Sequence, residues 1–195
     1  IGIDLPTEES FWKIESINND IFPVQADDPK IDDYFHNARR NKNFYATYDD
    51  YAYSVADIII VDINLDVDKT NDANGALLEF DVNLNGFKSA INTIGEKCRE
   101  NILILVESTV PPGSCKEIVQ PSIINSLKKR NLPVDKIKIG HSYERVMPGP
   151  NYIDSIENFY RVYSGIDKKS ADAVEVFLKT IIRTDEYPLT RLANT

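Results

Sequence analysis

Short apolar runs alternate along the chain with longer stretches in which apolar residues recur every three or four positions. The short runs predict strands over residues 1–3, 44–47, 56–63, 102–106, 137–139, 161–163 and 184–187. The amphipathic stretches predict helices over residues 8–18, 31–40, 80–98, 114–128 and 170–181. Ser170 is expected to cap the last of these helices, and the polar stretch 64–74 is expected to be a loop.

This order of elements predicts an α/β fold with a mostly parallel sheet and helices on both of its faces. The runs at 56–63 and 102–106 are almost wholly aliphatic, which is typical of strands buried on both faces. Ligands of such sheets bind beyond the carboxyl ends of the strands. Candidate chemistry is therefore sought just after the strands, at Asp4 and within 62–65, 107–113 and 141–149.

Charge and composition narrow the classes of function. The 195 residues suit a single domain, and 31 acidic against 22 basic residues give a net charge of −9. Such a chain is a poor binder of nucleic acid or of an anionic membrane surface. No apolar run is long enough to span a bilayer, and no signal peptide is visible, so a cytoplasmic protein is expected. The two cysteines and two histidines lack metal-ligand spacing, so no metal site is predicted.

The stretch from Glu107 to Gly113 follows a predicted strand and precedes a helix. Its two prolines and its glycine predict a rigid turn that presents the Thr109 hydroxyl, with the free N–H groups of the helix start, to a ligand. The alternative is a stiff loop with a satisfied threonine. Cys115 follows in the first helical turn, where the helix dipole favours a thiolate. Because no base lies nearby in sequence, a small packed residue is the preferred interpretation of Cys115.

The stretch from His141 to Gly149 follows another predicted strand. Glu144 is a candidate general base, and Arg145 is a candidate partner for a phosphate or a carboxylate. The alternative is a surface turn with one ion pair of little energetic value, and His141 alone is more typical of a structural residue. Asp4 ends the first predicted strand, where a carboxylate can accept hydrogen bonds from the ribose of NAD, although no G-x-G-x-x-G is present in the chain.

Together the two motifs, Glu-Ser-Thr-Val-Pro-Pro-Gly at 107–113 and Tyr-Glu-Arg-Val-Met-Pro-Gly at 143–149, resemble those of the UDP-glucose/GDP-mannose dehydrogenase family. The likeness extends over essentially the whole chain. It implies a Rossmann-like, doubly wound, mostly parallel sheet that is incomplete at its N-terminus. Residues 1–195 are then expected to be a single NAD-binding domain, a fragment without the first strand and its Gly-rich turn, the central dimer helix and the C-terminal sugar-binding domain.

The resemblance also implies a reaction. The family oxidises the C6 alcohol of a UDP- or GDP-linked sugar to the uronic acid for polysaccharide biosynthesis, in two NAD-dependent steps through a thioester on a cysteine. Cys98 and Cys115 do not match that cysteine, so this fragment alone is expected to be inactive, and the full-length protein is expected to be a homodimer. The form of the second motif is closer to members that act on UDP-N-acetylhexosamines or GDP-mannose.

Positions matched to the family give the expected site. Thr109 and Glu144 are the expected catalytic residues. The residues expected to bind the cofactor are Asp4, Asp62, Asn64, Ser108 and Thr109. The residues expected to bind the substrate are Glu144, Arg145, Val146 and Met147. The turn at 62–66 departs from the Val-Pro-Thr-Pro-like turn of the family, so its cofactor contacts are the weakest part of the match.

Two alternatives to this enzyme stay open at the level of sequence. One is a non-catalytic nucleotide-binding module that has kept the fold, which the unusual turn at 62–66 favours and the intact Thr109 and Glu144 disfavour. The other is a related two-domain dehydrogenase, of the 6-phosphogluconate or 3-hydroxyacid type, which has no reason to carry both proline-glycine loops.

Overall fold

A five-stranded sheet forms the centre of the molecule in the computed structural model, which describes residues 1–25, 27–65, 67–147, 149–193 and 195. The strand order is β3-β6-β7-β8-β9, and all neighbours are parallel except β7 and β8. The strands are β3 (Ile58–Val61), β6 (Leu103–Val106), β7 (Lys138–Ser142), β8 (Val162–Gly165) and β9 (Thr190–Arg191). The expected mostly parallel α/β sheet is therefore confirmed.

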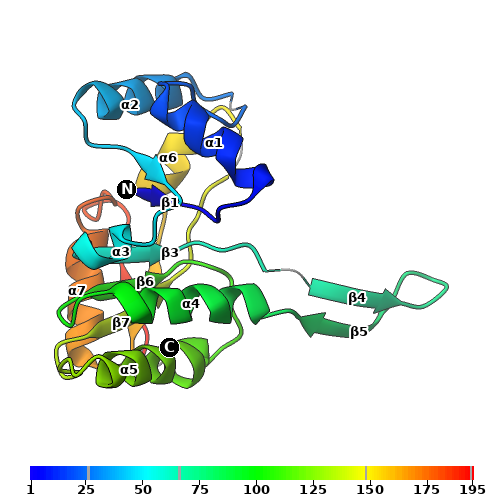
Figure 1. Ribbon diagram of the computed structural model, residues 1–195. Coiled ribbons are helices and arrows are strands. Elements are labelled where there is room, and N and C mark those ends of the chain that lie inside the picture. The colour runs from blue at the N-terminus through cyan, green and yellow to red at the C-terminus, as the bar shows by residue number, and fades with distance from the viewer. Residues whose placement is uncertain (26, 66, 148, 194) are drawn as a thin grey trace.

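Helices cover both faces of this sheet (Figure 1). One face packs on α4, α5 and the π-helical turn η1, and the other packs on α7. These elements are α4 (Asn85–Lys97), η1 (Cys115–Val119), α5 (Gln120–Lys129) and α7 (Lys168–Leu178). Alternate residues of β6 enter the two cores: Ile104 faces α4 and α5, whereas Leu105 faces α7. The prediction that this strand is buried on both faces is confirmed, and the sheet is doubly wound.

The same prediction is wrong for β3. Ile59 and Val61 are buried, but Ile58 and Ile60 are 39% and 47% exposed. The strand lies at the edge of the five-stranded sheet, where it pairs only with β6 among the described strands. The core formed with α7 draws on β6 and β8 and does not extend to β3. A run of β-branched residues predicts the strand, but it cannot show how far the helical cover extends.

A second, smaller unit contains the start of the chain. Its two strands pair in parallel, and two helices pack beside them (Figure 1). Its elements are β1 (Gly2–Ile3), α1 (Glu8–Asn18), α2 (Pro29–Arg40) and β2 (Ala46–Thr47), followed by α3 (Ala52–Val55). The Asn18 side chain pairs with both backbone groups of Ala46, and Arg39 donates to the carbonyl of Phe44. The predicted strands and helices of this region are confirmed, with α1 at the predicted bounds.

The stretch expected to be a loop contains half of a β-hairpin. Strands β4 (Val67–Asn71) and β5 (Leu77–Val82) pair antiparallel and project from the body of the molecule (Figure 1). The Asp72 carboxylate accepts hydrogen bonds from two backbone N–H groups of the turn, and Gly75 supplies its positive φ of 84°. The hairpin was missed because β4 is almost wholly polar, with the sequence Val-Asp-Lys-Thr-Asn. Phe80 and Val82, which were expected in the helix over residues 80–98, belong to β5, and the observed helix begins at Asn85.

Two further expectations near the C-terminus are wrong. Asp167, and not Ser170, caps α7, since its carboxylate accepts a hydrogen bond from the Ser170 N–H. The stretch 184–187 is a turn after α7, and the last strand is β9, which begins at Thr190.

Between β7 and β8 lies the short helix α6 (Tyr152–Glu157). Within the described ranges, none of the helices has the length and apolarity needed to cross a membrane.

Candidate active site

Three carboxylates gather at the carboxyl ends of β3, β6 and β7. The strands are in register, with Val61 paired to Val106 and Val106 paired to His141, so the residues that follow emerge at one edge. Asp62 is exposed, but partial desolvation at this edge raises its pKa, and the charge of Glu144 raises it further. Burial also raises the pKa of Glu107 to about 7, an effect that Arg161 opposes and the other two carboxylates reinforce. Glu107 can therefore exchange a proton near neutral pH at this edge.

The loop from Glu107 to Gly113, here called the first loop, is held from within and by the neighbouring strand. The Ser108 hydroxyl is buried, accepts a hydrogen bond from the N–H of Ile63 at 2.6 Å and donates to the carbonyl of Val61 at 3.2 Å. The Ser114 hydroxyl donates to the Pro111 carbonyl at 2.7 Å, and Gly113 has a φ of 89°. Thr109 is exposed beside these fixed groups. The first loop therefore presents one free hydroxyl from a rigid frame.

The Ser108 hydroxyl has a defined structural role. It fixes the start of the turn after β3, where Asp62 and Asn64 are exposed. Both hydrogen bonds of this hydroxyl are made to backbone groups of the protein, so Ser108 holds the backbone of the turn in place. A direct contact of Ser108 with a cofactor stays a prediction. Asp66, the last residue of the turn considered in the sequence, lies outside the described residues.

The loop from Tyr143 to Gly149, here called the second loop, is held by residues that follow it in the chain. Glu144 is partly buried, and its Oε2 accepts a hydrogen bond from the N–H of Val146 at 2.9 Å. Arg145 lies over the ring of Phe159 at 4.5 Å from the centroid, and the N–H of Met147 donates to Ser155 at 3.0 Å. The residues expected to bind substrate, Glu144 to Met147, therefore lie on one anchored segment. Pro148 of the motif lies outside the described residues.

His141 joins the two loops. Its Nε2 lies 3.3 Å from the carbonyl oxygen of Ser108, and its ring packs edge-on against Tyr143 with centroids 4.6 Å apart. Burial lowers the pKa of His141, so the ring is neutral at pH 7 and donates to the Ser108 carbonyl from Nε2. These contacts support the structural interpretation of this histidine.

Arg161 is the residue of this edge that sequence reasoning missed. It precedes β8, its side chain is 4% exposed, and its guanidinium lies 3.8 Å from the Glu107 carboxylate. It also donates to the carbonyl of Tyr143, directly before Glu144. A buried cation that interacts with Glu107 and Glu144 offsets part of the repulsion between these carboxylates, and here it also connects the two loops. The available signal was a lone arginine at the head of an apolar strand, which by itself indicates no partner.

Asp4 lies at the end of β1, on the smaller unit. It is exposed, and one carboxylate oxygen accepts a hydrogen bond from the N–H of Leu5 at 2.7 Å. A mainly apolar cavity of about 680 Å³ separates β1 from β3, with residues 1–3 on one side and residues 58–63 on the other. Asp4 and Asp62 thus follow the two strands that border this cavity.

The two cysteines are packed residues. Cys115 is 2% exposed, and burial raises the pKa of its thiol to about 12, which outweighs any effect of the helix start. Cys98 is fully buried, and burial raises its pKa as well. The interpretation of Cys115 as a small packed residue is confirmed, and burial with a raised pKa disfavours a nucleophilic thiolate at either cysteine.

Sequence comparison matches residues 1–182 to a family model described as the NAD-binding domain of the UDP-glucose/GDP-mannose dehydrogenase family. Among curated proteins, the UDP-N-acetyl-D-mannosamine dehydrogenase of Methanococcus maripaludis is 33% identical over 99 residues, which are 51% of this chain and 20% of that protein. The enzyme of the same name from Pyrococcus horikoshii is 28% identical over 103 residues, covering 53% of this chain and 24% of that protein. The matched part is thus a quarter or less of each relative.

Solved structures show the same fold. An NDP-N-acetyl-D-galactosaminuronic acid dehydrogenase from Methanosarcina mazei superposes with a TM-score of 0.82 at 20% identity, over all of this chain and 38% of that one. The UDP-D-ManNAc dehydrogenase of Pyrococcus horikoshii gives a TM-score of 0.74 at 20% identity, over all of this chain and 41% of that one. The chain spans less than half the length of these proteins.

Proposed function

The chain belongs to the UDP-glucose/GDP-mannose dehydrogenase family, and on that premise we propose that its full-length protein oxidises the C6 alcohol of a nucleotide sugar to the carboxylate. Per sugar, the alcohol, one water and two NAD⁺ give the carboxylate, two NADH and three protons. The observation that carries the proposal is the meeting of the two loops at the carboxyl edge, joined by His141 and Arg161. That edge is where parallel sheets bind their ligands.

The exposed residues of this edge, together with Asp4 of the smaller unit, suit an NAD site. NAD supplies the acceptor for the two hydrides. Asp4 offers a carboxylate oxygen to the adenosine ribose, and Asp62 and Asn64 are exposed after β3. Thr109 offers an exposed hydroxyl that can order a water molecule beside the reacting carbon. Ser108 acts from inside by fixing the turn that carries Asp62 and Asn64.

The cavity between β1 and β3 supports a further strand in the sheet. Within the described part of the chain, β1 pairs only with β2 and β3 pairs only with β6, so each has an edge without a strand. The cavity between them is lined mainly by aliphatic side chains, Ile58 and Ile60 among them. A strand with a Gly-rich turn, supplied by a segment outside residues 1–195, would cover these side chains and bring the turn between Asp4 and Asp62.

On the substrate side, Glu144 is the proposed general base. One of its oxygens is held by the Val146 N–H, which leaves the other free to accept a proton from a sugar hydroxyl or from the attacking water. Arg145, Val146 and Met147 are proposed to line the sugar site. Because Cys98 and Cys115 are buried, the cysteine that forms the thioester is proposed to lie outside this chain.

The names of the curated relatives favour a UDP-N-acetylhexosamine as the substrate, in keeping with the form of the second loop. The proposed setting is a cytoplasmic homodimeric enzyme of polysaccharide biosynthesis. The 195-residue chain on its own is proposed to be inactive, because the proposed nucleophile and the sugar-binding domain lie outside it.

Absorbance of NADH at saturating NAD, with the full-length protein and a panel of UDP- and GDP-sugars, tests this function. We expect two NADH per molecule of one UDP-N-acetylhexosamine, and a loss of about a hundredfold or more in Glu144→Gln. The matched control is Glu96→Gln, which changes an exposed glutamate on α4. If NAD binds but no nucleotide sugar yields NADH, the enzyme is excluded and the non-catalytic nucleotide-binding module takes its place.

A further inference from the structure

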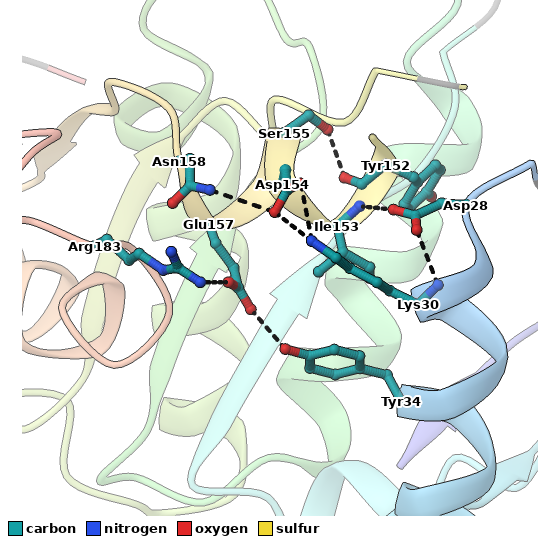
Figure 2. Close-up of polar contacts among 10 residues, drawn as sticks. All are labelled: Asp28, Lys30, Tyr34, Tyr152, Ile153, Asp154, Ser155, Glu157, Asn158 and Arg183. Atoms are coloured by element: carbon teal, nitrogen blue, oxygen red, sulfur yellow. Dashed lines mark hydrogen bonds and ion pairs between the residues drawn. The ribbon is translucent and has the colours of Figure 1, made fainter. Parts of the chain in front are cut away.

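Asp28 caps two helices that are far apart in sequence. Its side chain is buried, one carboxylate oxygen accepts the N–H of Lys30 in the first turn of α2, and the other accepts the N–H of Ile153 in the first turn of α6. Both distances are 2.9 Å, and the second joins residues 125 positions apart. Figure 2 shows the carboxylate between the two helix starts. The free N–H groups of both helices thus share one acceptor.

The short helix α6 depends on this outside cap. Its own N-cap residue, Asn151, makes no side-chain capping hydrogen bond. Lys30 adds an ion pair to Asp154 at 2.8 Å, and Tyr34 donates to Glu157 at 3.2 Å (Figure 2). These contacts are exposed and contribute little. The buried carboxylate of Asp28 is therefore the main link between α2 and α6.

Each of the two helices contacts a part of the molecule that carries proposed site residues. The N–H of Met147 in the second loop donates to Ser155 of α6, and Arg145 lies over Phe159 just beyond that helix. On the other side, α2 packs in the smaller unit that carries Asp4, where Arg39 at its C-terminal end fixes the chain before β2. A continuous set of contacts therefore runs from the smaller unit through Asp28 to the second loop.

We propose that Asp28 is a positioning residue that couples the smaller unit, with its proposed ribose contact at Asp4, to the second loop, with its proposed substrate contacts. Binding of NAD on one side then strengthens binding of the nucleotide sugar on the other, and linkage requires the effect to be reciprocal. The proposal rests on the function proposed above. The lowered pKa of Asp28, caused first by the hydrogen bond from Ile153, agrees with a carboxylate that is charged in this position.

Hydrogen exchange followed by mass spectrometry on the full-length protein, with and without NAD, tests the coupling. In ligand-free Asp28→Ala we expect amide exchange in residues 149–158 to rise roughly tenfold, the effect of losing a helix cap. In the wild type, NAD is expected to protect both the Asp4 region and residues 143–158. In Asp28→Ala, NAD is expected to protect only the Asp4 region. In steady-state kinetics of the same variant, we expect the KM for the sugar to rise by a larger factor than kcat falls.

Asp167→Ala is the matched control, because Asp167 caps α7 alone, accepting the Ser170 N–H at 2.7 Å. We expect it to change exchange in α7 and to leave NAD protection of residues 143–158 intact. Asp28→Asn keeps one acceptor oxygen, so an intermediate result is expected, and this variant replaces Asp28→Ala if the latter fails to fold.

The outcomes separate the two proposals. Equal NAD protection of residues 143–158 in the wild type and in the Asp28 variants overturns the coupling and leaves the proposed function intact. Unchanged ligand-free exchange in residues 149–158 of those variants has the same consequence. An absence of NAD protection at every segment of the wild type, Asp4 included, overturns the proposed function and the coupling with it.

Discussion

The first and second loops lie side by side, yet they are held in different ways. The first loop is fixed by Ser108, by its prolines and by Gly113, all within the loop or against the adjacent strand. The second loop is held from outside, by Arg161, by Ser155 and, through α6, by Asp28. One side of the proposed site is therefore a rigid frame, whereas the other side takes its position from distant parts of the chain.

The largest expected effect comes from breaking the outside support of the second loop at Arg161. Arg161→Met keeps most of the side-chain volume but leaves the Glu107 carboxylate and the Tyr143 carbonyl without their buried partner. We expect a loss of about 3 kcal/mol in the free energy of unfolding at pH 7, measured by urea denaturation.

Arg183→Met is the control for this change. Arg183 pairs with Glu157, but its side chain is 61% exposed, so a loss below about 1 kcal/mol is expected. Equal losses of unfolding free energy in the two variants would contradict this role, because the buried Arg161 would then contribute no more to stability than an exposed arginine.

A pH effect of similar size is expected at Glu107. Its pKa is raised from 4.5 to about 7, so between these values the folded protein keeps a proton that the unfolded chain has released. The free energy of unfolding therefore falls as the pH rises from about 4.5 to about 7 and levels off above that, by an amount on the order of 3 kcal/mol.

Glu107→Gln isolates this contribution, because it removes the titrating group and keeps the shape. The difference in unfolding free energy between wild type and variant is expected to change across this pH interval, as measured by urea denaturation at pH 5 and pH 7.5. With Glu96→Gln, at an exposed glutamate, the difference is expected to stay constant. A constant difference with Glu107→Gln would mean that this carboxylate is ionised throughout.

The frame of the first loop is tested at Ser108. Ser108→Ala leaves the N–H of Ile63 without its acceptor, and we expect a loss of about 1–3 kcal/mol in urea denaturation. Ser54→Ala is the control, because the Ser54 hydroxyl donates only to the Tyr51 carbonyl at an exposed site, and a loss below about 0.5 kcal/mol is expected. A Ser108 effect no larger than that of the control would place the rigidity of the first loop in its prolines instead.

The same contrast explains what the sequence could predict. Features set by neighbouring residues were predicted well: the bounds of α1, the strand β6 between two cores and the rigid turn of the first loop. Motif spacing also brought Thr109 and Glu144 to the same edge of the sheet. In each case the determinant is a periodic pattern or a local backbone restriction.

Features set by distant partners were missed. Asp28 could not be assigned to α6, because 125 residues separate it from its second partner. Arg161 is one arginine before a strand until the fold places it against Glu107. The hairpin β4–β5 was missed for another reason. Strand β4 is almost wholly polar, and Phe80 and Val82 of β5 also fit the apolar stripe of the helix expected over residues 80–98.

Thr109 gives the smallest expected change in stability and the sharpest test of the contrast between the first and second loops. Thr109 is exposed, and within the described part of the chain its hydroxyl makes no hydrogen bond. Thr109→Ala should therefore change the free energy of unfolding by less than about 0.5 kcal/mol. If the first loop is a frame that presents this hydroxyl, the same change should slow NADH formation by the full-length protein by roughly a hundredfold. Thr70→Ala, at an exposed threonine of β4, should alter neither quantity. A large loss of stability in Thr109→Ala would mean that Thr109 helps to hold the first loop in place. An unchanged rate of NADH formation would mean that the Thr109 hydroxyl has no role in the reaction.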